Sequence, residues 1–315
     1  MTSLVLAAID PTLDPWRFQP HPQVWLLITA LVGSYVYALK VIGPDAVRPG
    51  QPVVTRRQLM AFVGAMVLLW FASDWPMHDI SEEYLYSAHM LQHMVLAYFV
   101  PPLALIATPE WLMRAIVGDG RAYRIYRWFA HPVAAGLIFN VVVMVSHIPG
   151  VVNRSAENSP IHYLVHVIVV TSALLMWTPV CGPLKEFRIS VGGQMIYLFL
   201  MSVVPTVPAA WLTFAEGVVY THYDIPVRVF GLSATSDQQL AGVIMKLGGS
   251  VFLWSIVVYL FFRRFAARFA EENTYRRSAQ VPTSEIVGND EVALTYAEVQ
   301  EAFERSEPAP EPQPN

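Results

Sequence analysis

The chain is poor in charged residues. Only 14% of its 315 residues are Asp, Glu, Lys or Arg, whereas 55% are hydrophobic, and its mean hydropathy is +0.43. Soluble globular domains carry about 25% charged residues, so this composition excludes an ordinary water-soluble domain. A chain that crosses lipid must satisfy its own backbone hydrogen bonds, as helices or as a closed barrel. Because the apolar stretches are continuous rather than alternating, they predict helices.

The chain also has only one cysteine, and its first 16 residues contain no Lys or Arg. The single cysteine, Cys181, excludes an internal disulfide framework, and we expect it to be a packed residue rather than a metal ligand. The N-terminal stretch MTSLVLAAIDPTLDPW lacks the basic start of a secretory signal, so we expect no cleaved signal peptide. We expect lipid around the chain and no nucleic-acid partner.

Seven apolar segments are long enough to cross about 30 Å of hydrocarbon at about 1.5 Å per residue. They lie near residues 23–42, 58–75, 88–107, 132–149, 162–181, 191–213 and 238–262. Proline interrupts two of them, at Pro101-Pro102 and at Pro205 with Pro208, and kinks are expected there because proline removes a helical hydrogen bond. The sequence therefore predicts an all-α integral membrane protein, a bundle of seven transmembrane helices.

Basic residues concentrate on alternate connections between these segments. The richer connections and the tail carry Arg48, Arg56, Arg57, Arg114, Arg121, Arg124, Arg127, Lys185, Arg188, Arg263, Arg264 and Arg268. The other connections carry Arg17, Arg154 and Arg228. Basic loops stay in the cytoplasm, so the N-terminus is predicted outside and the C-terminus in the cytoplasm.

Three regions follow from this topology: an external segment 1–22, a membrane domain 23–262 and a cytoplasmic tail 263–315. Residues 109–130 mix basic and aromatic residues and are expected to lie along the inner interface. The tail turns acidic and ends in PAPEPQPN, which indicates disorder. A short amphipathic helix is predicted near 290–304, as a partner-docking helix or as an idle surface helix.

Two histidine pairs carry the chemical signal. His89 and His93 begin the third segment, and His162 and His166 begin the fifth. Residues at i and i+4 share one face of a helix, so each pair can hold a single ion. His147 ends the fourth segment. The predicted topology places all five imidazoles at one depth, just below the outer interface.

These side chains suit a transition metal. Neutral imidazole binds copper, zinc and iron. Nearby Met90 and Met94 offer thioether sulfur, which favours Cu(I), although packing is the commoner role of methionine. His78 and His222, on outer loops, are candidates for relaying the ion. Two other interpretations remain: interfacial histidines extend their polar tips towards water without binding metal, and paired histidines also ligate haem.

Lys246 is a cation about two turns inside the seventh segment. A charge at that depth is costly unless it is paired. Asp74 and Asp237 are the candidate partners for an intramembrane ion pair. One interpretation is an ion pair with a structural role only. The other, more specific interpretation is a role in gating or proton transfer.

The order of motifs resembles the seven-helix CtaG-type cytochrome c oxidase assembly factors. The run His89-Met90-Leu91-Gln92-His93 precedes Pro101-Pro102 and Pro109. Further matches are His147 with Pro149, His162, His166, Trp177-Thr178-Pro179-Val180, Gly182-Pro183, Tyr220, Tyr223, Asp237-Gln238-Gln239-Leu240-Ala241-Gly242 and Ile244-Met245. The resemblance covers nearly all of 15–265. Val165, Lys246 and Ser146 depart from the family's usual acidic, aromatic and tryptophan residues.

The resemblance implies a non-enzymatic factor in the bacterial plasma membrane that helps to build a haem–copper oxidase, at the copper-insertion stage. Its partners would be cytochrome c oxidase subunits and an external copper chaperone. With the histidines, this predicts transient binding of Cu(I) by His89, His93, His162, His166 and His147. The alternatives are a haem-binding redox protein and a metal-free scaffold for oxidase subunits.

Overall fold

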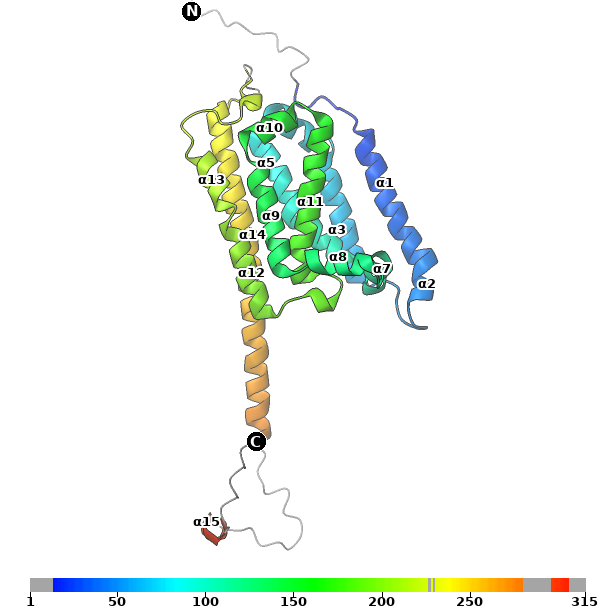
Figure 1. The fold of residues 1–315 in the computed structure, drawn as a ribbon, viewed down its shortest axis with the longest axis vertical. Coiled ribbons are helices and arrows are strands. Elements are labelled where there is room, and N and C mark those ends of the chain that lie inside the picture. Colours follow the sequence, from blue (N-terminus) through cyan, green and yellow to red (C-terminus); the bar gives the residue numbers. More distant parts are fainter. Residues whose placement is uncertain (1–13, 226–227, 229, 280–295, 306–315) are drawn as a thin grey trace, which may run out of the picture. The chain divides into compact units, whose positions relative to one another are not determined.

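The computed structural model describes residues 14–225, 228, 230–279 and 296–305. Within these residues every regular element is a helix (Figure 1). The chain divides into two compact units, Met1–Phe262 and Arg263–Asn315. Residues 263–315 were predicted to form a largely disordered tail, but residues 263–279 and 296–305 are helical. The rest of that prediction concerns residues 280–295 and 306–315, and part of the predicted external segment is 1–13. Both lie outside the described residues.

Five helical segments of the described chain are long and apolar enough to cross a membrane. They are Pro22–Ala46, Tyr86–Ala107, Ser159–Cys181, Val191–Thr213 and Ala234–Thr274. Two further segments are bent pairs, Arg56–Ser73 with Met77–Tyr84 at 48° and Arg121–Phe129 with Pro132–Ser146 at 68°, so there are up to seven. All seven predicted segments coincide with these helices. The protein is a multi-pass membrane protein, and its predicted orientation stays a prediction.

The individual helices of the first unit follow the chain in order. They are α1 (Pro22–Tyr37), η2 (Ala38–Ile42), α2 (Gly43–Ala46), α3 (Arg56–Ser73), α4 (Met77–Asp79), η3 (Ile80–Tyr84), α5 (Tyr86–Met94), η4 (Val95–Phe99), α6 (Val100–Ala107), α7 (Glu110–Val117), α8 (Arg121–Phe129), α9 (Pro132–Ser146), α10 (Pro149–Ala156), α11 (Ser159–Cys181), η5 (Lys185–Phe187), α12 (Val191–Val203), α13 (Thr206–Thr213) and η6 (Thr221–Tyr223). The long α14 (Ala234–Ala279) crosses the unit boundary, and α15 (Tyr296–Arg305) lies where a tail helix was predicted.

Prolines interrupt two of the spanning segments, as predicted. The π-helical turn η4 precedes Pro101, and Val204-Pro205 separates α12 from α13. Neither Pro101 nor Pro102 can donate a hydrogen bond back to the carbonyls of η4. The indole of Trp177 on α11 donates instead to the carbonyl of Ala97, at 3.0 Å. A neighbouring helix therefore satisfies a backbone group that the prolines leave free, as a membrane interior requires.

The core of the first unit lies between α5, η4, α9, α11, α12 and α14. Phe139, Trp177 and Leu253 are among its fully buried side chains, and Tyr98 is also buried. Helices α13 and α14 approach closely at Gly242, where a Cβ atom would lie 2.7 Å from the carbonyl oxygen of Ala209. Small residues permit such close helix contacts in membranes.

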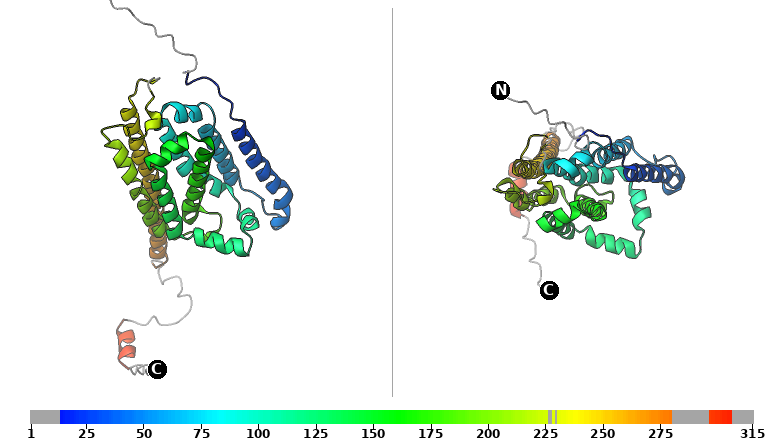
Figure 2. Two further views of the ribbon diagram at one scale, coloured as in Figure 1. Left: turned by 45° about the horizontal axis from the view of Figure 1, so that its top comes forward. Right: turned by 90° about the horizontal axis from the view of Figure 1, so that it is seen from above.

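The two ends of the first unit differ. Helices α7 and α8, which make up the segment predicted to lie at the inner interface, are at one end, where α7 lies beside α2 (Figure 1). Helix α10 and the start of α5 are at the opposite end, and the tilted view agrees (Figure 2). The predicted metal-binding histidines belong to this second end.

Candidate metal centre

Helix α5 begins against a carboxylate from a distant part of the chain. Its N-cap residue, Leu85, provides no side-chain cap. Instead the fully buried Asp237, at the start of α14, accepts hydrogen bonds from the backbone N–H of Tyr86 at 2.7 Å and of Ser87 at 3.0 Å. A carboxylate at a helix N-terminus satisfies free donors and complements the helix dipole. Asp237 thereby fixes the turn that precedes His89.

Helix α11 begins with a local cap. The Asn158 side chain accepts a hydrogen bond from the backbone N–H of Ile161 at 3.1 Å. Ser155 on α10 places its hydroxyl 3.4 Å from Nδ1 of His162. These contacts therefore hold the first two turns of α11, which carry His162 and His166.

The two histidine pairs meet. Ring centroids are 4.5 Å apart for His89 and His93 and 4.4 Å apart for His162 and His166. Between the helices, His93 and His166 are 4.8 Å apart and His89 and His166 are 5.9 Å apart. One nitrogen from each of His89, His93 and His166 lies within 4.8 Å of the others, close enough to bind one metal ion.

A second group includes a residue that the sequence analysis missed. Glu82, on η3, joins His162 and His166 with ligand atoms within 4.8 Å of one another. Its Oε1 atom is 2.8 Å from Nε2 of His162 and 3.1 Å from Nδ1 of His78. Glu82 precedes the third apolar segment in an acidic stretch with no periodic signal. Only packing of η3 against α11 reveals its place.

Several of the ligand atoms are buried without a hydrogen-bond partner. They are Nδ1 of His89, Nε2 of His147, Nε2 of His162, Nε2 of His166 and Oε1 of Glu82. Two of these atoms, Oε1 of Glu82 and Nε2 of His162, face each other at 2.8 Å, which is an ion-pair distance. Buried polar atoms are nearly always hydrogen-bonded. A concentration of such atoms in one place is what a metal ion would satisfy.

His147 completes the cavity without joining either group. Its Nδ1 donates to the carbonyl oxygen of Val143 at 2.7 Å, because only a protonated nitrogen can bond to that acceptor. Its Nε2 therefore carries the lone pair. With His89, His93, His162 and His166, it lines a cavity of about 30 Å³, which exceeds the roughly 10–15 Å³ needed for one water.

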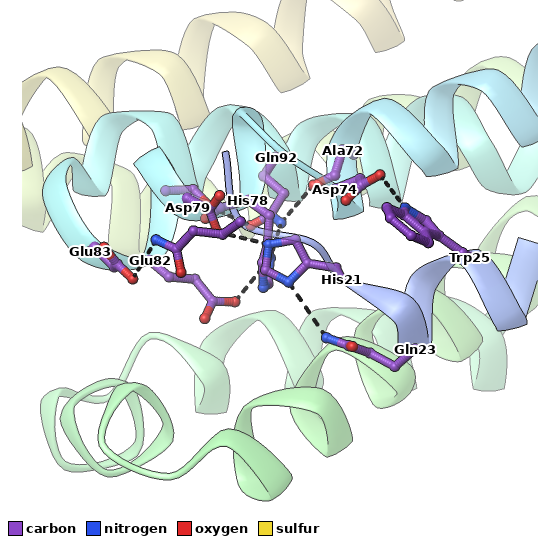
Figure 3. Close-up of polar contacts among 12 residues, drawn as sticks. His21, Gln23, Trp25, Ala72, Asp74, His78, Asp79, Glu82, Glu83 and Gln92 are labelled. Carbon is purple, nitrogen blue, oxygen red and sulfur yellow. Dashed lines mark hydrogen bonds and ion pairs between the residues drawn. The ribbon is translucent and has the colours of Figure 1, made fainter. Parts of the chain in front are cut away.

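The predicted accessory residues lie at different distances from this cavity. Met90 lines it, and Met94 lines the adjoining cavity with His93 and His147. His78 is buried beside Glu82, and its ring centroid is 4.6 Å from that of His21 (Figure 3). His222 is not among the residues that line the cavity, and its backbone N–H donates to Asn153.

The three residues predicted to form an intramembrane ion pair have other partners. Lys246 donates to the Thr206 hydroxyl at 2.6 Å. Asp74 accepts from the indoles of Trp25 at 2.8 Å and Trp70 at 2.6 Å, and Asp237 caps α5. Among the described residues, no ion pair joins Lys246 to either carboxylate. Lys246 instead has a hydroxyl acceptor, Asp74 has indole donors and Asp237 has backbone N–H donors, so the expectation of a pair is corrected.

Residues 33–267 match the family model of the cytochrome c oxidase caa3 assembly factors. The chain belongs to this family. The matched part of this caa3 assembly factor includes both histidine pairs, His147, Glu82 and Asp237, and the resemblance inferred from the motifs is confirmed. Searches of curated proteins and of solved structures found no match.

Proposed function

We propose that this caa3 assembly factor binds Cu(I) with the two histidine pairs and delivers it to a haem–copper cytochrome c oxidase. The observation that carries the proposal is the meeting of His89, His93 and His166, whose ligand nitrogens lie within 4.8 Å of one another. In this role the ion is cargo, and the protein acts as a metallochaperone without catalysing a reaction.

The donor set supports copper. Imidazole nitrogens dominate, and Met90 lines the same cavity, so the site offers borderline and soft ligands. Magnesium or calcium would require mainly oxygen ligands. Zinc shares the preference for imidazole, and the family's link to a haem–copper oxidase favours copper over zinc.

The place of delivery follows from the charge pattern. Basic connections indicate that the histidine end of the bundle faces outward from the bacterial plasma membrane. An external copper chaperone could then load the site, and oxidase subunits inserted in the same membrane could receive the ion.

Copper binding tests this proposal. The purified protein is titrated with Cu(I), and bound metal is counted for the wild type and for His89→Ala/His93→Ala/His166→Ala. The control is His131→Ala, which alters an exposed histidine at the start of α9, at the opposite end of that helix from His147. We expect the wild type and the control to bind copper and the triple variant to lose it. Unchanged copper in the triple variant would overturn the proposal.

The same preparation separates the two alternatives. Bound haem gives a Soret absorption band, whereas Cu(I) does not, so an optical spectrum identifies a haem protein. A metal-free scaffold predicts that cells with the triple variant assemble fully active oxidase. Under the copper proposal these cells accumulate an oxidase that lacks copper.

A further inference from the structure

Glu82 brings a carboxylate to a set of ligands that is otherwise imidazole. The group Glu82, His162 and His166 shares His166 with the group His89, His93 and His166. The cavity of the second group is small, about 30 Å³. The structure therefore contains two adjoining positions for a metal ion, with one histidine common to both.

The two positions differ in access. The Glu82 side chain is 31% exposed, whereas His89 and His93 are 8% and 9% exposed. Next to Glu82, contacts continue through His78 and His21 to Asp79 (Figure 3), and both His78 and Asp79 are buried. His21 bonds to Asp79 at 2.8 Å and is 13% exposed. The more exposed Glu82 side chain would therefore meet an arriving ion before His89 does.

The contacts of Glu82 indicate more than a structural ion pair. One carboxylate oxygen of Glu82 faces two imidazole nitrogens, Nε2 of His162 at 2.8 Å and Nδ1 of His78 at 3.1 Å. A metal ion can take the place of the proton between Glu82 and His162, because carboxylate and imidazole bind metal ions once they are deprotonated.

Ligand chemistry gives the transfer a direction. A carboxylate oxygen is a hard donor, and Cu(I) prefers softer ligands. The position that contains Glu82 should hold Cu(I) more weakly than the all-imidazole position of His89, His93 and His166. An ion bound first at Glu82 gains affinity by moving inward.

We propose that Glu82, His162 and His166 form a loading position, from which Cu(I) passes to His89 and His93 while it stays bound to His166. The step is an exchange of ligands: the bonds to Glu82 and His162 break as bonds to His89 and His93 form, with no change in oxidation state. This proposal rests on the proposed copper-binding function.

Loading kinetics test the proposal. A coloured Cu(I)–chelator complex is mixed with the full-length protein, and loss of colour reports transfer to the wild type, to Glu82→Gln and to the matched control Glu83→Gln. Glu83 is the exposed neighbour. We expect Glu82→Gln to load roughly tenfold more slowly or worse, while final bound copper and the rate of Glu83→Gln stay at wild-type values.

Two further variants complete the design. Glu82→His supplies an imidazole in place of the carboxylate and should restore fast loading. His89→Ala/His93→Ala should keep a weakly held ion that is lost when Glu82→Gln is added. A wild-type loading rate in Glu82→Gln, or no rescue by Glu82→His, overturns the loading position even if copper binding is intact. A wild type that binds no copper overturns the proposed function itself.

Discussion

His147 differs from the other cavity histidines in how its ring is held. The bond from Nδ1 to the carbonyl oxygen of Val143 fixes its tautomer and leaves Nε2 as a lone pair. Yet His147 belongs to neither group whose ligand atoms lie within 4.8 Å. We infer that it supports the cavity or binds the ion as it leaves, and that the other four histidines hold the ion.

Replacing His147 should therefore have a smaller effect than replacing a shared ligand. We expect His147→Ala to keep the bound copper count and to weaken Cu(I) binding about tenfold, and His166→Ala to weaken it by about 100-fold or more. Competition with a Cu(I) chelator measures both. His222→Ala, whose ring does not line the cavity, is the control and should bind as the wild type does. Equal losses for His147→Ala and His166→Ala would contradict this ranking.

At the scale of elements, α5 depends on a residue of another helix. Asp237 on α14 accepts the first two N–H groups of α5, and Gln238 beside it accepts from Val219 N–H at 2.8 Å and donates to the Tyr220 carbonyl at 3.1 Å. The start of α14 thus fixes both α5 and the loop before η6. The motif Asp237-Gln238-Gln239 positions the helix that carries His89 and His93, two of the candidate metal ligands, and does not contact the ligands itself.

Loss of this cap should disturb the candidate metal site, because the cap holds the start of α5, the helix that carries His89 and His93. Asp237→Asn replaces one accepting oxygen with an amide that faces the N–H of Tyr86 or Ser87. We expect a loss of roughly 1–2 kcal/mol in stability, seen as an unfolding temperature several degrees lower in detergent, together with weaker Cu(I) binding. Asp224→Asn removes an exposed carboxylate that pairs with Arg228 and should change neither. A stable Asp237→Asn protein with normal copper affinity would show that α5 is held by packing alone.

At the scale of the whole molecule, the metal site belongs to one unit. Glu82 and the five cavity histidines all lie in Met1–Phe262, whereas α15 lies in Arg263–Asn315. Tyr296 of α15 is 85% exposed, which fits the amphipathic helix predicted for the tail. The proposed copper binding and any docking by the tail would thus use different parts of the chain.

Removal of residues 280–315 should leave copper binding intact. We expect the truncated protein to bind the same amount of Cu(I), with an affinity within about twofold of the full chain, since the residues that line the cavity all belong to Met1–Phe262. Equilibrium titration measures the affinity, and oxidase activity in cells reports the role of the tail. Copper loss on truncation would show that the tail shapes the site. Normal copper with low oxidase activity would assign the tail to partner docking.

The sequence by itself determined the helical segments and the two histidine pairs. Long apolar runs are local properties, and so is the i,i+4 spacing of His89 with His93 and of His162 with His166. The shared position of both pairs along the bundle also followed from the predicted topology. These features need no knowledge of which helices are neighbours.

Only the tertiary structure decided which side chains meet. Glu82 joins His162, Asp237 caps a helix 150 residues away from it, and Lys246 bonds to Thr206 rather than to a carboxylate. None of these contacts produces a periodic pattern in the sequence, because each depends on how two helices pack and rotate against one another. The sequence thus predicted the imidazole ligands, whereas packing determined the carboxylate beside them and the cap that positions them.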